Sequence, residues 1–401
     1  MKSFFATLVL FAAALSAACG STDADVAAAQ GLAGRIVPGY ASKIRFEKLA
    51  PAADSADRFE LETVGRKLVV RGNNANSMAV GLNHFLKYSA RANVSWFADL
   101  PVEVPAQMPQ VAEKVAHRAL LDDRFFLNYC TFGYTMVWWQ WRDWERLIDW
   151  MALNGVTLPL AITGQEAVWA RVWQKLGLTD EQIRSYFTGP AHLPWHRMSN
   201  LDYWQSPLPQ SWLDAQVELQ QRIVAREREL NMKPVLPAFA GHVPAELGTI
   251  YPEAKISRMS KWGGFEDRYR SHFLDPLDPL FARIQREFLA EQTALFGTDH
   301  IYGADPFNEV DPPSWEPEFL ARVSRTIYDT MAAADPEAEW LQMTWLFYLD
   351  RHKWHDDRIE AFVKAVPQDK MLLLDYYCEN TEVWRQTHSY HGQPYFWCYL
   401  G

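Results

Sequence analysis

Residues 300–347 read HIYGADPFNEVDPPSWEPEFLARVSRTIYDTMAAADPEAEWLQMTWLF and contain one complete repeat of the pattern that decides the fold. The short apolar run at 300–304 predicts a strand, and residues 317–334 carry apolar side chains at the three-to-four spacing of a helix. A second apolar run at 340–347 predicts another strand. A strand, a helix and a strand in this order predict a βαβ unit, in which the two strands are parallel.

The same alternation extends from residue 118 to the end of the chain, which predicts an α/β fold. Repeated βα units imply a TIM-type (β/α)8 barrel, and a closed barrel of this type has eight strands. We count about seven strands, and Gly401 follows the seventh directly, so we expect the barrel to be incomplete. The predicted strands are 124–128, 156–162, 233–239, 300–304, 340–347, 370–375 and 395–400, and the predicted helices are 142–154, 211–230, 278–295, 317–334 and 357–365.

Residues 31–112 predict a small α/β domain that precedes the barrel domain at 115–401. Residues 58–63 and 67–71 alternate as strands do around a Gly65-Arg66 turn, and 75–88 has helical spacing. Three prolines between 101 and 110 indicate a linker. We expect this domain to have a packing or accessory role.

The first residues predict an export signal. A lysine precedes the apolar segment at 4–15, and small residues follow it, so we interpret 1–18 as a signal peptide. The small residues before Cys19 resemble a bacterial lipobox, in which that cysteine is lipidated; simple cleavage of the signal is the alternative. Residues 19–30 would form a tether. We therefore expect an exported protein of the periplasm or the outer-membrane or cell surface, in contact with a membrane only through a lipid anchor.

The amino-acid composition argues against one class of ligand and favours another. The chain has 39 basic and 49 acidic residues, a net charge of −10, and no basic run, which argues against a nucleic-acid partner. Its 18 tryptophans are more than packing usually requires, and all but one lie between Trp138 and Trp397. Indole faces stack on sugar rings, so the composition favours a carbohydrate ligand.

Cysteine and histidine spacing does not predict a metal site. The three cysteines after Cys19 include no C-x-x-C pair, and their odd number leaves at least one of them free. The closest histidine pairs lie among prolines, tryptophans or charges rather than at zinc spacing. These cysteines are Cys130, Cys378 and Cys398, and the histidine pairs are His192/His196 and His352/His355.

Glu309 is the strongest candidate for catalysis. TIM-barrel sites form at the carboxyl ends of the strands, and Glu309 follows the fourth predicted strand in the motif ADPFNE. An Asn-Glu pair in this place is typical of retaining glycosidases, in which the glutamate protonates the leaving oxygen and the asparagine can hold the C2 substituent of the sugar. Asn308 and Glu309 form that pair here. The alternative is that Glu309 caps the next helix or pairs with a surface arginine.

Four long motifs resemble those of the α-N-acetylglucosaminidase family of glycoside hydrolases, and the chain is similar to a bacterial homologue in that family. They are RFFLNYCTFGYTMVWWQWRDWERLIDWMALNGVTLPLAITGQEAVWARVW (124–173), FTGPAHLPWHRMSNLDYW (187–204), GADPFNEVDPPSWEP (303–317) and GQPYFWCYL (392–400). The resemblance implies a small α/β domain, a TIM-like barrel and an all-helical C-terminal domain, for which the chain has no residues left. It also implies an exo-hydrolase that removes terminal α-linked N-acetylglucosamine from glycans by retaining double displacement, with two glutamates and no cofactor.

The resemblance assigns roles to individual residues. The catalytic acid/base falls on Glu309, and the family's Gly-Gln-Glu motif falls on Gln165 and Glu166, which could equally support the start of a helix. Most tryptophans between 138 and 150 are expected to pack in the core. The sugar-pocket residues fall on Asn128, Cys130, Trp195, Trp262 and Trp345.

The second catalytic carboxylate is not identified within the chain. The family's nucleophile lies beyond the Phe-Trp-Cys block, so we expect it beyond Gly401 and expect this chain to be a truncated form. Asp375 and Glu379 follow the sixth strand, but nothing places either one against Glu309. The competing hypothesis is a non-catalytic, surface-anchored lipoprotein that binds glycans. The sequence leaves the oligomeric state open.

Overall fold

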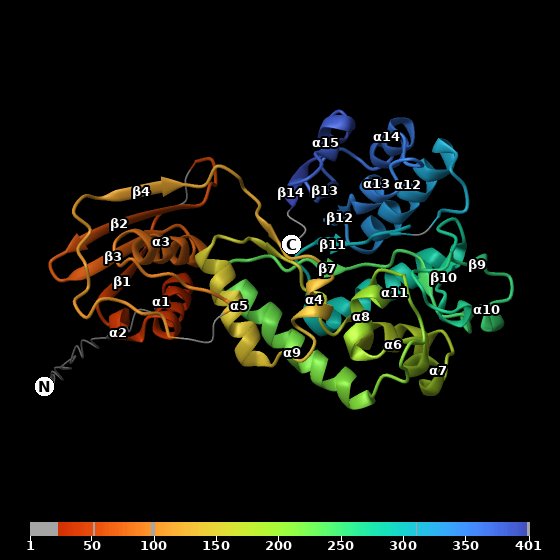
Figure 1. Ribbon diagram of the computed structural model, residues 1–401, viewed down its shortest axis with the longest axis horizontal. Helices are drawn as coiled ribbons and strands as arrows, with labels where there is room; N and C mark the ends of the chain where they lie inside the picture. The colour runs from red at the N-terminus through yellow and green to blue at the C-terminus, as the bar shows by residue number, and fades with distance from the viewer. Residues whose placement is uncertain (1–22, 51–52, 98–100, 310, 399–401) are drawn as a thin grey trace, which may run out of the picture.

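The computed structural model describes residues 23–50, 53–97, 101–309 and 311–398 (Figure 1). The predicted signal peptide, Cys19 and the first residues of the predicted tether lie outside the described residues. Among the helices that are described, none is long and apolar enough to cross a membrane.

The N-terminal domain is a four-stranded sheet with the order β1-β3-β2-β4 and helices packed on it. The predicted strands at 58–63 and 67–71 and the helix at 75–88 are confirmed, and β2 and β3 form the expected antiparallel hairpin. The elements are α1 (Ala24–Ile36), α2 (Pro38–Ala41), β1 (Ile44–Lys48), β2 (Arg58–Val64), β3 (Lys67–Gly72), α3 (Ala75–Tyr88) and β4 (Val115–Arg118).

Two predicted boundaries of this domain are wrong. Residues 24–30 belong to α1, where Ala28 and Ala29 are buried, instead of forming a tether. The small residues that suggested a tether are also good helix formers that permit close packing. Val115–Arg118 pairs with β2 and so belongs to this sheet, not to the barrel. That strand is short and mostly exposed at an edge, so its sequence shows no clear alternation.

The second domain contains all seven predicted strands, arranged in parallel and in the order of the sequence. An isolated bridge between Leu160 and Val235 connects the β5–β6 pair to the other five. Among the described residues no ladder joins β14 to β5, although the rings of Phe125 and Phe396 lie 6.4 Å apart. The strands are β5 (Phe125–Phe126), β6 (Leu158–Pro159), β7 (Leu236–Pro237), β11 (Ile301–Gly303), β12 (Glu339–Met343), β13 (Met371–Tyr376) and β14 (Tyr395–Cys398).

Long helices alternate with these strands, as the periodicity predicts (Figure 1). One prediction is wrong in part: the strand expected at 340–347 ends at Met343, and Trp345 begins a short helix. A short apolar run fits either a strand or a buried helix, so its pattern could not separate the two. The helices are α5 (Trp141–Leu153), α6 (Gln165–Lys175), α9 (Gln210–Glu229), α11 (Pro279–Phe296), α12 (Pro317–Ala334), α13 (Trp345–Leu349) and α14 (Asp356–Lys364).

Shorter elements lie in the insertions at the carboxyl ends of the strands. A small antiparallel sheet with the order β8-β10-β9 follows β7. These elements are α4 (Thr131–Tyr134), α7 (Asp180–Tyr186), α8 (Leu193–Arg197), β8 (His242–Val243), α10 (Leu247–Ile250), β9 (Ile256–Arg258), β10 (His272–Leu274) and α15 (Val383–Gln386), together with the 3-10 turns Pro190–His192, Asp267–Tyr269 and Tyr390–Gly392.

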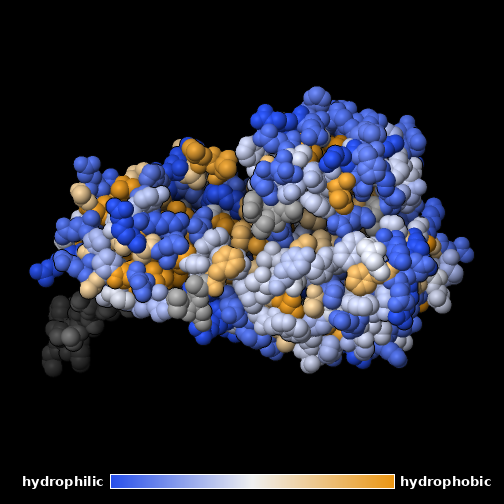
Figure 2. Space-filling view, in the orientation of Figure 1, coloured by the Kyte–Doolittle hydropathy of each residue, from blue (hydrophilic) through white to orange (hydrophobic). Residues whose placement is uncertain are grey.

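The two domains share one hydrophobic core and several buried polar contacts. Arg35 of α1 makes two hydrogen bonds of 2.7 Å to Asp149 of α5, and Asn76 of α3 donates to the Val156 carbonyl at 2.8 Å. On the face shown in Figure 2, hydrophobic patches lie on the N-terminal domain and near the contact between the domains, while hydrophilic residues cover most of the rest. These contacts agree with the expected packing role of the N-terminal domain.

Candidate active site

Glu309 lies beyond β11, at the carboxyl end of the parallel sheet. The turn that presents it is unusual, because Phe307 and Glu309 have φ angles of 63° and 57° without being glycines. Such backbone strain persists where the surrounding structure enforces it and is common at functional sites. Phe307 is buried against Phe273, with ring centroids 5.1 Å apart, and this contact anchors the turn.

Two tryptophans fix the carboxylate of Glu309. Trp262, in the loop between β9 and β10, donates its indole N–H to Oε2 at 2.6 Å, and Trp345, the first residue of α13, donates to Oε1 at 2.9 Å. Each carboxylate oxygen therefore has one neutral donor. The structure brings together three of the residues that the sequence assigned to the site, from segments far apart in the chain.

An aromatic wall continues from Trp262. The ring of Trp195 in α8 lies 6.2 Å from Trp262, and Tyr134 contacts Trp195 edge-on at 5.4 Å. Phe265 stacks on Trp262, with an interplanar angle of 14°. Rings of this kind offer broad apolar faces next to a carboxylate, which suits the alternating polar and apolar surface of a sugar.

Cys130 and Asn128 lie in the loop after β5. Burial raises the pKa of the free Cys130 thiol to about 11, and the nearby charge of Glu309 acts in the same direction. The thiol is therefore a neutral wall of the site at physiological pH and not a nucleophile. The side-chain oxygen of Asn128 accepts hydrogen bonds from the backbone and hydroxyl of Thr131, both at 3.0 Å, and thereby supports the start of α4.

Asn308 is buried directly before Glu309. Its carbonyl accepts a hydrogen bond from the Asn200 side chain at 3.3 Å, which ties the segment after α8 to the turn that carries Glu309. Its side-chain oxygen is buried and has no hydrogen-bond partner among the described residues. Buried polar atoms are nearly always paired, so this oxygen is a candidate acceptor for a ligand or a water molecule.

Glu166 has a structural role, which is one of the two roles that the sequence allowed for it. Its carboxylate is 1% exposed and makes a two-pronged ion pair with Arg197, at 2.6 and 2.9 Å. Gln165 is also buried. The pair therefore anchors α6 to the segment that carries Trp195.

Two aspartates near the strand ends, the buried Asp375 and the half-buried Asp305, also have structural partners. Asp375 accepts a hydrogen bond from the Trp384 backbone at 3.1 Å, and burial raises its pKa to about 6. Burial raises the pKa of Asp305 to about 7, although hydrogen bonds from the Met343 backbone and Tyr129 act in the opposite direction. Asp305 precedes Glu309 in the same motif but was not among the predicted site residues.

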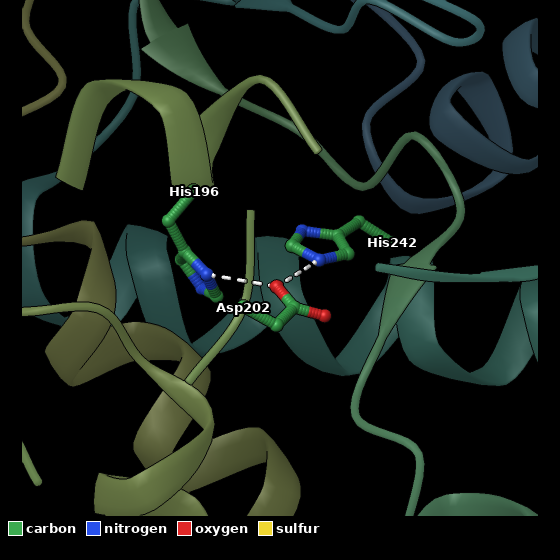
Figure 3. Close-up of side chains that lie close together, drawn as sticks. All are labelled: His196, Asp202 and His242. Atoms are coloured by element: carbon green, nitrogen blue, oxygen red, sulfur yellow. Dashed lines mark hydrogen bonds and ion pairs between the residues drawn. The ribbon is translucent and has the colours of Figure 1, made fainter. Parts of the chain in front are cut away.

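A cluster of His196, Asp202 and His242 lies beside this site (Figure 3). Oδ1 of Asp202 is 3.1 Å from Nδ1 of His196 and 2.7 Å from Nε2 of His242. Histidine spacing did not predict this cluster, because His242 and Asp202 are 40 residues apart in the sequence. The cluster is recognisable only in the folded chain, where two histidines flank a buried aspartate. No fixed spacing in the sequence predicts such an arrangement.

Comparisons with known proteins agree with this architecture. Residues 27–110 match the sequence model of the alpha-N-acetylglucosaminidase N-terminal domain, and residues 124–401 match that of its tim-barrel domain. Human "Alpha-N-acetylglucosaminidase" is 42% identical over 400 residues, which are 98% of this chain and 53% of the human protein. The chain thus spans about half the length of this curated relative.

Solved structures of a family 89 glycoside hydrolase from Clostridium perfringens are also similar. The complex with 2-acetamido-1,2-dideoxynojirmycin has a TM-score of 0.85 and 27% sequence identity to this chain. The matched region covers 93% of this chain and 42% of the Clostridium perfringens chain. A variant of that protein with two Glu→Gln substitutions is in complex with its substrate, GlcNAc-alpha-1,4-galactose, and has the same TM-score and identity over 41% of its own length.

Proposed function

The chain belongs to the α-N-acetylglucosaminidase family, and from this premise we propose that it removes terminal α-linked N-acetylglucosamine from glycans. The observation that carries the proposal is the position of Glu309 at the carboxyl end of β11, with both oxygens held by Trp262 and Trp345. A carboxyl group fixed in this way, beside an aromatic wall, can deliver a proton to a glycosidic oxygen in one orientation.

In the proposed mechanism Glu309 acts twice. It first protonates the leaving oxygen, and it then removes a proton from the water that releases the sugar. The neutral thiol of Cys130 and the rings of Trp195 and Trp262 would enclose the sugar. The substrate complex of the Clostridium perfringens relative, which contains GlcNAc-alpha-1,4-galactose, supports a glycan with terminal α-N-acetylglucosamine as the ligand.

We propose that the reaction is a retaining double displacement. An α-linked gluco sugar lacks the trans C2 substituent that a substrate-assisted route uses, which favours a carboxylate of the enzyme as the nucleophile. In retaining enzymes this second carboxylate lies about 5–5.5 Å from the first. Asp375 is buried and accepts a hydrogen bond from the Trp384 backbone, which argues against it as the nucleophile. The family resemblance places the nucleophile after the Phe-Trp-Cys block, so we propose that it is not among the described residues. The two Glu→Gln substitutions in the relative's substrate complex support a pair of catalytic glutamates.

The substitution Glu309→Gln tests the role of Glu309. It is made in a form of the protein that hydrolyses an aryl α-N-acetylglucosaminide, whatever the length of that form. We expect turnover of a natural glycoside to fall by about 10²–10⁴-fold, because a poor leaving group needs the proton. An aryl glycoside with a good leaving group should keep most of the rate of its first step. Glu316→Gln, at an exposed position in the same segment, is the matched control. Unchanged turnover of both substrates by Glu309→Gln would refute the assignment.

A second assay concerns residues 1–401 themselves. We expect them to bind the sugar without turning over an aryl α-N-acetylglucosaminide, because the nucleophile is proposed to lie elsewhere. Robust turnover would show that a carboxylate of this chain acts as the nucleophile. Binding without turnover in every longer natural form would favour the non-catalytic, surface-anchored glycan-binding lipoprotein instead.

The proposal includes export, supported by the apolar segment at 4–15 and the small residues before Cys19. Lipidation of Cys19 would hold the protein at a membrane surface. The substitution Cys19→Ala should then move the protein from the membrane fraction to the soluble fraction. If the wild-type protein is soluble and starts at another residue by mass spectrometry, lipidation is excluded.

A further inference from the structure

The His196–Asp202–His242 cluster is nearly sealed from solvent. Asp202 has no exposed surface and His196 is 3% exposed, while the His242 side chain is 11% exposed (Figure 3). The ring of Tyr186 from α7 covers both imidazoles, with centroids 4.7 Å and 5.3 Å away. A charged carboxylate in such a place requires strong partners, and the two imidazoles supply them.

The geometry determines which nitrogens carry protons. Nδ1 of His196 faces two acceptors, the Leu201 carbonyl at 3.1 Å and Oδ1 of Asp202 at 3.1 Å, so this nitrogen must be a donor. Nε2 of His242 lies 2.7 Å from Oδ1 of Asp202, and it donates to this oxygen when Asp202 is ionised. A metal ion needs the lone pairs of these same nitrogens. The arrangement therefore fits a hydrogen-bonded cluster better than a metal site.

Further titratable groups surround the cluster on every side. His272 of β10, Tyr186 of α7 and Tyr203 beyond α8 all interact with the charge of Asp202, Glu246 bonds to Tyr203, and Arg258 and Arg270 act on His272. Burial lowers the pKa of His242. Burial alone would raise the pKa of Asp202, but the two imidazoles more than offset it and hold that pKa low.

The cluster joins two segments that carry the aromatic wall of the candidate site. His196 follows Trp195 in α8, and His242 lies in β8, which pairs with β10 of the hairpin that carries Trp262. The same junction has two further bonds, from the Asp202 amide to the Tyr269 carbonyl at 3.0 Å and from the Ser271 hydroxyl to the Ser199 carbonyl at 2.6 Å.

We propose that Asp202, through His196 and His242, is a positioning residue that fixes Trp195 against Trp262 and thereby sets the shape of the sugar pocket. The proposal rests on the proposed function for the identity of the ligand. It does not make the cluster a participant in the reaction, because none of its groups contacts Glu309. Loss of a donor to Asp202 should therefore alter the aromatic wall before it alters the overall fold.

A matched pair of substitutions at His242 tests this proposal. His242→Leu removes the donor to Asp202, whereas His242→Gln keeps an N–H near the position of Nε2. We expect His242→Leu to weaken binding of 2-acetamido-1,2-dideoxynojirmycin to residues 1–401 by about tenfold, because Trp195 and Trp262 lose the support that holds them in place around the sugar. His242→Gln should bind within about threefold of the wild type on the same reasoning. Asp267→Asn, at an exposed site of the hairpin, is the control.

A second readout does not depend on sugar binding. With 5-fluorotryptophan incorporated, the ¹⁹F signals of Trp195 and Trp262, assigned by Trp→Phe substitutions, should shift in His242→Leu and stay in place in His242→Gln. If the wild type does not bind the iminosugar but these signals shift, the ligand is wrong and the positioning role survives. If His242→Leu fails to fold, Asp202→Asn, which keeps the side-chain shape but loses the charge, is compared instead and should shift the same signals.

Two outcomes would overturn the proposal. The first is that His242→Leu folds and leaves both the ¹⁹F signals and the iminosugar affinity unchanged. Where His242→Leu does not fold, the same result with folded Asp202→Asn counts instead. Either result would mean that the cluster has only a structural role. The other is stoichiometric binding of Zn²⁺ by the wild type that raises its unfolding temperature and is lost in Asp202→Asn, which would make the cluster a metal site.

Discussion

Glu166 and Glu309 both follow strands of the barrel at their carboxyl ends, yet they have different surroundings. Glu166 is buried, and Arg197 occupies both of its oxygens, at 2.6 and 2.9 Å. Glu309 is half-buried and accepts one neutral indole N–H at each oxygen. A cation closes the first carboxylate off, whereas the second remains accessible to a ligand. Position in the fold therefore identifies candidates, and the partners of each candidate separate support from chemistry.

The largest expected effect is on stability, at Arg197. Arg197→Leu leaves the carboxylate of Glu166 buried without its cation, which typically costs about 3–5 kcal/mol. Glu309→Gln keeps the size of a side chain that has neutral donors only, and should change the unfolding free energy by less than about 1 kcal/mol. Chemical unfolding of both variants measures the difference. Equal unfolding free energies for the two variants would mean that Glu166 does not depend on its arginine for stability, and that it does not differ from Glu309 in this respect.

Asp305 extends the comparison to a carboxylate with hydrogen bonds but no cation. Its pKa is raised from the ordinary range to about 7, mainly by burial. The protonated form therefore favours the folded state, and this group costs stability as the pH rises from about 4 to 7. Asp305→Asn has no charge to bury, so its stability relative to the wild type should increase over this range, by about 2 kcal/mol between pH 5 and 7.

The difference between Asp305→Asn and the wild type is the quantity to measure, by chemical unfolding at several pH values. Asp375, whose pKa burial raises to about 6, adds a slope of the same sign in both proteins and cancels in the difference. A difference that stays constant from pH 5 to 7 would show that Asp305 is ionised throughout that range in the folded protein.

Much of the fold could be predicted because central parallel strands are continuous apolar runs with helices between them. Each of the seven predicted runs contains a strand, and Glu309 was proposed as a site residue because its motif directly follows one of them. Side-chain partners were beyond prediction. Glu166 and Arg197 meet across 31 residues, and His242 meets Asp202 across 40, at separations that no local period encodes. The helix at Trp345 was missed because TWLF also fits a strand.

The smallest expected effect tests the donors to Glu309 directly. Trp262→Phe and Trp345→Phe keep an aromatic ring but remove one N–H each, so that one carboxylate oxygen loses its partner. In a form of the protein that turns over a natural glycoside, each should lower kcat/KM by about tenfold, equivalent to about 1.4 kcal/mol, with little change in the unfolding free energy.

Trp150→Phe is the matched control, because Trp150 of α5 packs against Phe126 with ring centroids 5.4 Å apart, whereas the indole donors to Glu309 are Trp262 and Trp345. It should leave kcat/KM unchanged within about twofold, since it removes no donor to the carboxylate. If the double substitution at Trp262 and Trp345 is no worse than either single one, the two donors act as a unit. If neither single substitution lowers kcat/KM, the two indole rings only enclose the site and do not assist Glu309. The difference between Glu309 and Glu166 would then consist only in the ion pair that Glu166 makes with Arg197.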